Sequence, residues 1–162
     1  MDNLAETPFH YPLTFILRHR KENLKKCSLE GMKPSKEIEF FTYPQDNLPF
    51  IPNTIILKCE APILTEADQG SPLLILDGTW KYAAQMEKYV WSLGSYKARS
   101  LPPLYETAYP RKQTDCPAPL RGLASIEALY IAYRLLGREK KGLLDHYFWK
   151  EEFLKKNATL FC

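Results

Sequence analysis

The sequence predicts a single α/β domain over residues 1–162, with a core at about residues 13–157, in which helices flank a mostly parallel sheet. A chain of 162 residues suits one compact domain, because single domains cluster near roughly 100–150 residues. Short apolar runs alternate with segments of helical periodicity, which is the order expected of βαβ units. Residues 73–76 are apolar at every position, as is typical of a strand covered on both faces of a parallel sheet.

Further strands are predicted on both sides of that run. Residues 13–17 form an apolar run that ends in the basic segment 18–21, so a buried strand should lead into a basic loop there. Residues 38–43 and 54–57 are similar runs with prolines nearby that interrupt regular structure. Residues 97–101 predict one more short strand.

Helices are predicted after residue 79 and in the C-terminal part of the chain. Thr79 is a candidate N-cap and Gly94 a candidate C′ residue for the first helix. The second apolar stripe stops at Gly137. In order, the apolar stripes that predict helices are Ala83, Met86, Val90 and Leu93, then Ile126, Leu129, Tyr130, Tyr133 and Leu136, then Leu144, Tyr147, Phe148 and Leu154.

Composition excludes several classes of protein. The chain is 45% hydrophobic and 25% charged, which is ordinary for a soluble domain, and no apolar run approaches the roughly 20 residues that span a bilayer. Residues 1–6 carry acids where a targeting peptide carries bases, which favours the cytoplasm. No membrane partner is expected, and the oligomeric state stays open, with a monomer favoured.

The cysteines and histidines do not indicate a metal site. The four cysteines are scattered without a C-x-x-C pair, so reduced thiols are expected rather than a zinc site or a disulfide framework. His10, His19 and His146 are too far apart in the sequence to predict a metal triad. We therefore expect no metal ion.

Asp77 is the strongest candidate for chemistry. It ends the all-apolar run and precedes Gly78, and in open α/β sheets ligands bind beyond the carboxyl ends of the strands. An acid there is placed to accept a proton or to orient a nucleophile. From the pattern alone, Asp77 is equally interpretable as a helix cap, and Trp80 as a core aromatic.

Basic residues cluster in two loops, which suits phosphate contacts. Residues 18–28 hold five Lys or Arg residues against one acid, and the long segment 102–122 adds further bases. Loops as long as the second are uncommon unless functional. A run of charge is also compatible with a solvated face, so both interpretations stay open.

Residues 76–80, Leu-Asp-Gly-Thr-Trp, resemble the signature Asp-x-Thr-Trp of the DTW-domain family. Residues 17–29 resemble the first block of that family and of its relatives in the TDD superfamily, the ribosomal-RNA aminocarboxypropyl transferases. Similar blocks follow in the same order at residues 64–68, 99–110, 123–128, 144–149 and 152–157, so the resemblance covers nearly the whole chain. Departures from the ribosomal relatives at Thr79 and at residues 109–111 favour the DTW side.

This resemblance implies a fold and a reaction. The fold would be SPOUT-like, with a C-terminal trefoil knot, a rare exception to the usual rules of topology. The reaction would be transfer of a 3-amino-3-carboxypropyl group from S-adenosylmethionine to a uridine-type base in tRNA or rRNA, releasing methylthioadenosine. Asp77 would assist deprotonation of the acceptor imide. Trp80 would pack against the methyl group and the adenosine side of the cofactor, with its ring favouring the sulfonium.

The resemblance implies a set of cofactor-binding residues, and the clusters of basic residues predict a set that contacts RNA. Residues implied to bind the cofactor are Ser28, Leu57, Leu76, Gly78, Trp80, Leu101, Leu123, Ala124 and Ser125. Basic residues expected to contact RNA are Arg18, Arg20, Lys25, Lys26, Arg99, Arg111 and Lys112. For Arg99 a role in holding loop structure is equally open. Two other functions are compatible with the same residues: a SPOUT-type RNA methyltransferase, and an RNA-binding module without catalysis.

Overall fold

The computed structural model describes residues 12–21, 28–32, 36–110 and 122–161. Its centre is a five-stranded sheet in the order β2-β1-β4-β3-β5, with every pair of neighbours parallel. The strands are β1 (Thr14–His19), β2 (Ile38–Tyr43), β3 (Ile55–Leu57), β4 (Leu73–Asp77) and β5 (Lys97–Arg99). The predicted α/β class and parallel sheet are confirmed.

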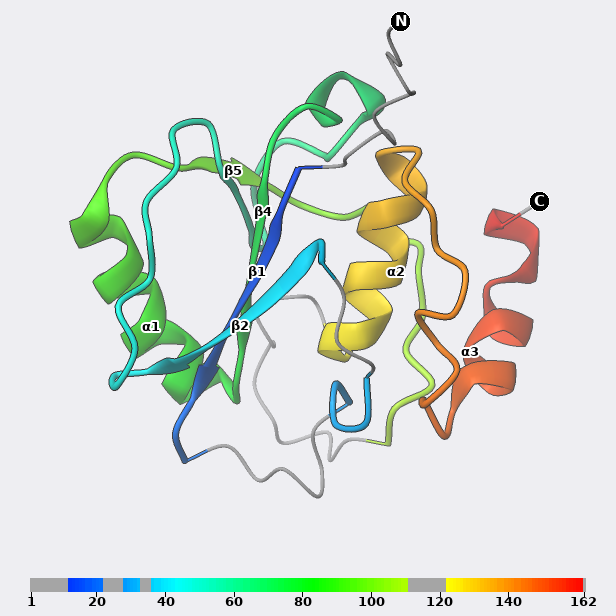
Figure 1. Cartoon of the computed structure of the whole chain (residues 1–162). Helices are drawn as coiled ribbons and strands as arrows, with labels where there is room; N and C mark the ends of the chain where they lie inside the picture. Colours follow the sequence, from blue (N-terminus) through cyan, green and yellow to red (C-terminus); the bar gives the residue numbers. More distant parts are fainter. Residues whose placement is uncertain (1–11, 22–27, 33–35, 111–121, 162) are drawn as a thin grey trace, which may run out of the picture.

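Helices cover both faces of this sheet (Figure 1). Helix α1 (Trp80–Leu93) lies on one face, and α2 (Ser125–Leu135) lies on the other, with α3 (Lys150–Lys156) outside α2. Short 3₁₀ turns, η2 (Glu66–Asp68) and η3 (Ala158–Leu160), complete the described elements. Among the described residues, none of the helices combines the length and apolar character that crossing a membrane requires.

Alternation along the strands divides the core into two layers. Ile16, Leu73 and Ile75 pack with α2, whereas Leu17 and Leu76 pack with α1, because successive side chains of a strand point to opposite faces. The strand β4 is buried at all five positions, as the all-apolar run predicts. Since the strands are parallel, their carboxyl ends meet at one edge of the sheet, and Arg18 of β1 lies opposite Asp77 of β4.

The predicted elements match the structure except in the C-terminal segment. Thr79 is at the N-cap of α1, although its side chain makes no capping hydrogen bond. The helical stripe predicted from Leu144 is wrong over residues 144–149, which form turns, and the helix begins only at Lys150. Phe148, expected on the buried stripe, is 84% exposed. Turn hydrogen bonds of the i to i+3 type, such as Tyr147 N to Leu144 O, replace the helical pattern.

A buried hydroxyl pair joins β1 to α2 and makes a testable contribution to stability. Thr14 Oγ1 and Tyr133 Oη are 2.6 Å apart, and burial raises the pKa of Tyr133 above its ordinary value of 10.0. Because the folded state retains that proton more strongly than the unfolded state, the stability contributed by Tyr133 is complete below pH ~10 and is lost as the pH rises further.

We therefore expect Tyr133→Phe to lower the free energy of unfolding at pH 7 by about 1–2 kcal/mol, because Thr14 loses its buried partner. The variant should also lose stability less steeply above pH ~10 than the wild type. Some slope should remain, since burial also raises the pKa of Tyr96. Urea denaturation at pH 7 and in alkaline buffer measures both effects, and equal slopes in the two proteins would contradict the expectation.

Candidate functional site

Asp77 is the centre of the candidate site, at the carboxyl edge of the sheet. The residue is 4% exposed, and its carboxylate is held from two sides. Arg18 Nε donates to Oδ2 at 3.1 Å, and Ser125 Oγ donates to Oδ1 at 2.8 Å. Because these partners come from β1 and from the first turn of α2, the carboxylate has a fixed orientation where β1, β4 and α2 meet.

Ser28 and His146 extend the site along the start of α2. Ser28 Oγ accepts a hydrogen bond from the Ile126 amide at 3.1 Å. The Ser28 carbonyl lies 2.8 Å from His146 Nε2, and because a carbonyl only accepts, Nε2 carries the proton. Ser28 thus links the N-terminal end of α2 to the C-terminal segment of the chain.

Glu127 accepts four hydrogen bonds from described residues of the site. It is fully buried, at 0% exposure, and Oε1 accepts from the Thr107 hydroxyl at 2.6 Å and from the Ala124 amide at 2.8 Å. The other oxygen, Oε2, accepts from the Ala108 amide and from Tyr147 Oη, both at 2.9 Å. Glu127 therefore fixes three segments to one another: residues 107–108, the start of α2, and the segment after residue 144.

The amides at the start of α2 are only partly engaged. The Ala124 amide donates to Glu127 and the Ile126 amide to Ser28. Within the described part of the chain, the Ser125 amide between them has no hydrogen-bond partner. The first amides of a helix have no partner inside the helix, so the Ser125 N–H is a donor that a ligand can use.

The apolar residues implied to surround a cofactor divide between the two core layers. Leu57 ends β3, Leu101 follows β5 and Leu123 precedes α2, and all three belong to the buried cluster on the α2 face. Leu76 belongs to the cluster on the α1 face, although it directly precedes Asp77. The structure therefore gathers three of the four leucines on the face of the sheet that carries Asp77 and Ser125.

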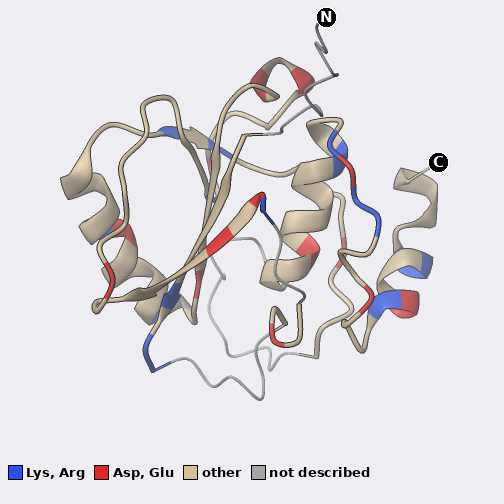
Figure 2. Ribbon diagram, in the orientation of Figure 1, with Lys and Arg blue, Asp and Glu red and all other residues tan. Residues whose placement is uncertain are grey.

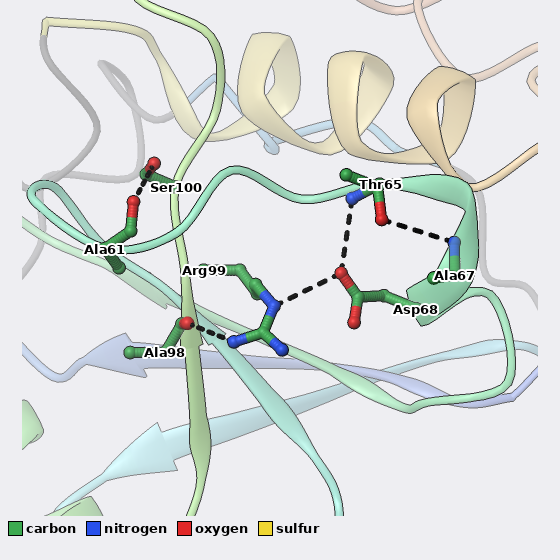
Figure 3. Close-up of polar contacts among 7 residues, drawn as sticks. All are labelled: Ala61, Thr65, Ala67, Asp68, Ala98, Arg99 and Ser100. Carbon is green, nitrogen blue, oxygen red and sulfur yellow. Dashed lines mark hydrogen bonds and ion pairs between the residues drawn. The ribbon is translucent and has the colours of Figure 1, made fainter.

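Arg99 is held by contacts with its own surroundings (Figure 3). Its Nε donates to Asp68 Oδ2 at 3.2 Å, and Nη1 donates to the Ala98 carbonyl at 2.8 Å. The same Asp68 oxygen accepts the Thr65 amide at 3.2 Å, which closes the capping box of η2. These contacts tie the carboxyl end of β5 to η2, so Arg99 holds loop structure, and its side chain remains 26% exposed.

The predicted RNA-contacting residues differ in their placement. Arg18 pairs with Asp77, and its side chain is 18% exposed, whereas Arg20, in the loop after β1, is exposed. Gly78 connects Asp77 to the N-cap of α1. Lys25, Lys26, Arg111 and Lys112 lie outside the described residues, and Trp80 is described only as the first residue of α1.

Glu127 and His146 are site residues to which the sequence assigned no role. A Glu at the third position of a helix is a capping pattern, but the pattern lacked its usual partner, because Ala124 stands at the N-cap. The contact of His146 with Ser28 spans 118 positions of the chain, and no local sequence pattern predicts such a contact.

The chain matches no protein-family model and no curated protein. Among solved structures, it is similar to that of the SAM-dependent rRNA:acp-transferase Tsr3 from Vulcanisaeta distributa. The two chains share 23% sequence identity with a TM-score of 0.67, over 93% of this chain and 81% of that chain. The α/β fold of this protein is thus the fold of a known RNA-modifying transferase.

Proposed function

We propose that this protein is a transferase that modifies RNA and uses S-adenosylmethionine as its donor. The observation that carries the proposal is the arrangement of Asp77, a buried carboxylate held by Arg18 and Ser125 at the carboxyl edge of the sheet. Ligands of open α/β sheets bind at that edge. The solved structure with the similar fold is that of a SAM-dependent rRNA:acp-transferase, which supports the same class of reaction here.

Residues on the α2 face have the chemistry needed to hold an adenosyl compound. Leu57, Leu101 and Leu123 belong to one buried apolar cluster, and ligand sites for aromatic rings are usually lined by apolar side chains. The Ser125 amide is a donor without a partner among the described residues, and suits a carboxylate or a ribose oxygen. The sequence adds Trp80, whose indole would favour a sulfonium.

Transfer of the 3-amino-3-carboxypropyl group is the finer part of the proposal. S-adenosylmethionine supplies an electrophilic γ-carbon, which bonds to a base nitrogen while the carbon–sulfur bond breaks and its electron pair leaves with methylthioadenosine. Asp77 would accept a hydrogen bond from the imide N–H of a uridine-type base and assist removal of its proton. The bonds from Arg18 and Ser125 fix the carboxylate before the base arrives, which favours alignment.

We also propose that the protein is a member of the DTW-domain family and that it has a C-terminal trefoil knot. The blocks of resemblance support this proposal, since they run through nearly the whole chain in one order. The same blocks support an RNA substrate, either tRNA or rRNA, and we propose that the protein acts in the cytoplasm.

Nucleoside mass spectrometry of total tRNA and rRNA, from cells with and without the gene, tests substrate and reaction together. We expect one aminocarboxypropyl uridine to disappear when the gene is absent. Purified protein incubated with that RNA and S-adenosylmethionine should release methylthioadenosine. Release of S-adenosylhomocysteine would instead establish a methyltransferase, and lack of S-adenosylmethionine binding in calorimetry would support an RNA-binding module without catalysis.

Lys25 and Lys26 provide a test of the predicted basic loop. Replacing both by Ala should weaken RNA binding and reduce the slope of log Kd against log salt by about one to two, because each phosphate contact contributes about 0.7–0.9 to that slope. Filter binding at several salt concentrations measures both quantities. An unchanged slope would show that the loop is a solvated face.

A further inference from the structure

An aromatic stack lies at the carboxyl edge of the sheet, on the face opposite Asp77. The rings of His19, the last residue of β1, and Tyr82, in the first turns of α1, are nearly parallel at 11°, with centroids 3.9 Å apart. Asp77 and Arg18 belong to the α2 face, whereas His19 alternates to the α1 face. The stack and the candidate site therefore lie on either side of one strand end.

The His19 ring is fixed by hydrogen bonds at both nitrogens. Its Nδ1 accepts from the Lys21 amide at 3.1 Å, so the proton of the neutral ring is on Nε2, which donates to Gln85 Oε1 at 3.1 Å. Tyr43 also packs against the histidine, at a tilt of 42° and with centroids 5.5 Å apart. His19 is only 5% exposed, so it forms a rigid support under the Tyr82 ring.

Tyr82 itself is half-buried, and basic residues adjoin both stacked residues in the chain. Arg20 and Lys21 are exposed directly after His19, and Lys81 is exposed directly before Tyr82. Figure 2 shows the basic residues that follow β1 in blue, at the end of the sheet where α1 begins. The acid Asp77 at this edge is engaged by Arg18 and Ser125.

We propose that Tyr82, supported by His19, is a stacking platform for an unpaired RNA base next to the modified nucleotide, and that Arg20 and Lys21 hold its flanking phosphates. A flat ring among cationic side chains is the combination that binds single-stranded nucleic acid. This inference rests on the proposed function, because it takes RNA as the substrate of the neighbouring site.

One exposed aromatic side chain outside this edge, Phe148, lacks this combination. Phe148 is 84% exposed, but the exposed acids Asp145, Glu151 and Glu152 are close to it in the chain. The charge there is mixed rather than basic, since Lys150 pairs with Asp145 at 3.1 Å. Phe148 is therefore a matched control, an exposed aromatic ring outside the basic edge.

The test compares two fluorescein-labelled probes of equal charge, dodecauridylate and an abasic ribose-phosphate 12-mer, by fluorescence anisotropy with the full-length protein. Tyr82→Ala and Tyr82→Leu should weaken binding of dodecauridylate about 5- to 150-fold, because a base loses its stacking ring. Binding of the abasic probe should change less than about 3-fold, since the phosphate contacts remain. Tyr82→Phe and Phe148→Ala should bind both probes like the wild type.

Tyr82→Leu retains apolar packing on His19, so it keeps the test valid if Tyr82→Ala melts at a lower temperature. Equal binding of dodecauridylate by Tyr82→Leu and wild type would overturn the proposal and leave this edge to another class of partner. Equal losses for both probes would also overturn it, because the ring would then act only through the fold. Selective loss for dodecauridylate without release of methylthioadenosine would uphold the platform and overturn the proposed aminocarboxypropyl transfer.

Discussion

Asp77→Asn should retain the affinity of the protein for S-adenosylmethionine and lose about 100-fold or more of its turnover, the usual contribution of a general base. Asn has the shape of Asp and its oxygen still accepts the hydrogen bond from Ser125, so the start of α2 should stay in place, while its NH₂ group faces Arg18 in place of Oδ2. It cannot take the proton of an imide. Single-turnover kinetics with methylthioadenosine as the measured product give the rate, and calorimetry gives the affinity.

Two variants separate this chemical role from loss of structure. Trp80→Ala should weaken cofactor binding through lost packing, whereas Asp77→Asn should lower turnover and leave cofactor binding unchanged. Ser125→Ala removes one hydrogen bond to Asp77 and should reduce turnover only about 5- to 10-fold, in line with the ~1 kcal/mol of an ordinary hydrogen bond. If Asp77→Asn turned over like the wild type, the carboxylate would have no part in proton transfer.

Local sequence patterns predicted most strands and helices of this protein, because these elements depend on residues that are neighbours in the chain. The apolar run before Asp77 predicted β4 and, through it, the place of the carboxylate at the edge of the sheet. The partners of Asp77 did not follow from any local pattern. Arg18 and Ser125 are 59 and 48 positions away, and their contact depends on the order of strands and on where α2 begins.

The segment after residue 144 shows how tertiary contacts override periodicity. Its apolar spacing predicts a helix, yet Tyr147 directs its hydroxyl to Glu127, and the neighbouring His146 directs its ring to Ser28. Phe148 points to solvent instead. Consecutive residues that serve different partners are better accommodated by turns than by one helical face, and propensity is a weak preference beside buried hydrogen bonds.

Glu127→Ala should be among the most destabilising single substitutions in the chain, lowering the free energy of unfolding by about 3–5 kcal/mol. The carboxylate accepts from the Thr107 and Tyr147 hydroxyls and from the amides of Ala108 and Ala124. Hydroxyls can turn towards new partners, but the two backbone amides have no such freedom. Each buried donor left without an acceptor costs about 1–3 kcal/mol.

Glu127→Gln should lose less stability than Glu127→Ala, about 1–2 kcal/mol, because the amide oxygen still accepts two donors while its NH₂ group opposes an N–H donor. Urea denaturation of both variants measures the difference. Glu139→Ala is the matched control, since Glu139 accepts one exposed amide hydrogen bond from Lys141 and should change stability by less than about 0.5 kcal/mol. If Glu127→Ala lowered the free energy of unfolding no more than Glu139→Ala, water would have replaced the carboxylate. The three segments that Glu127 joins would then hold together without it.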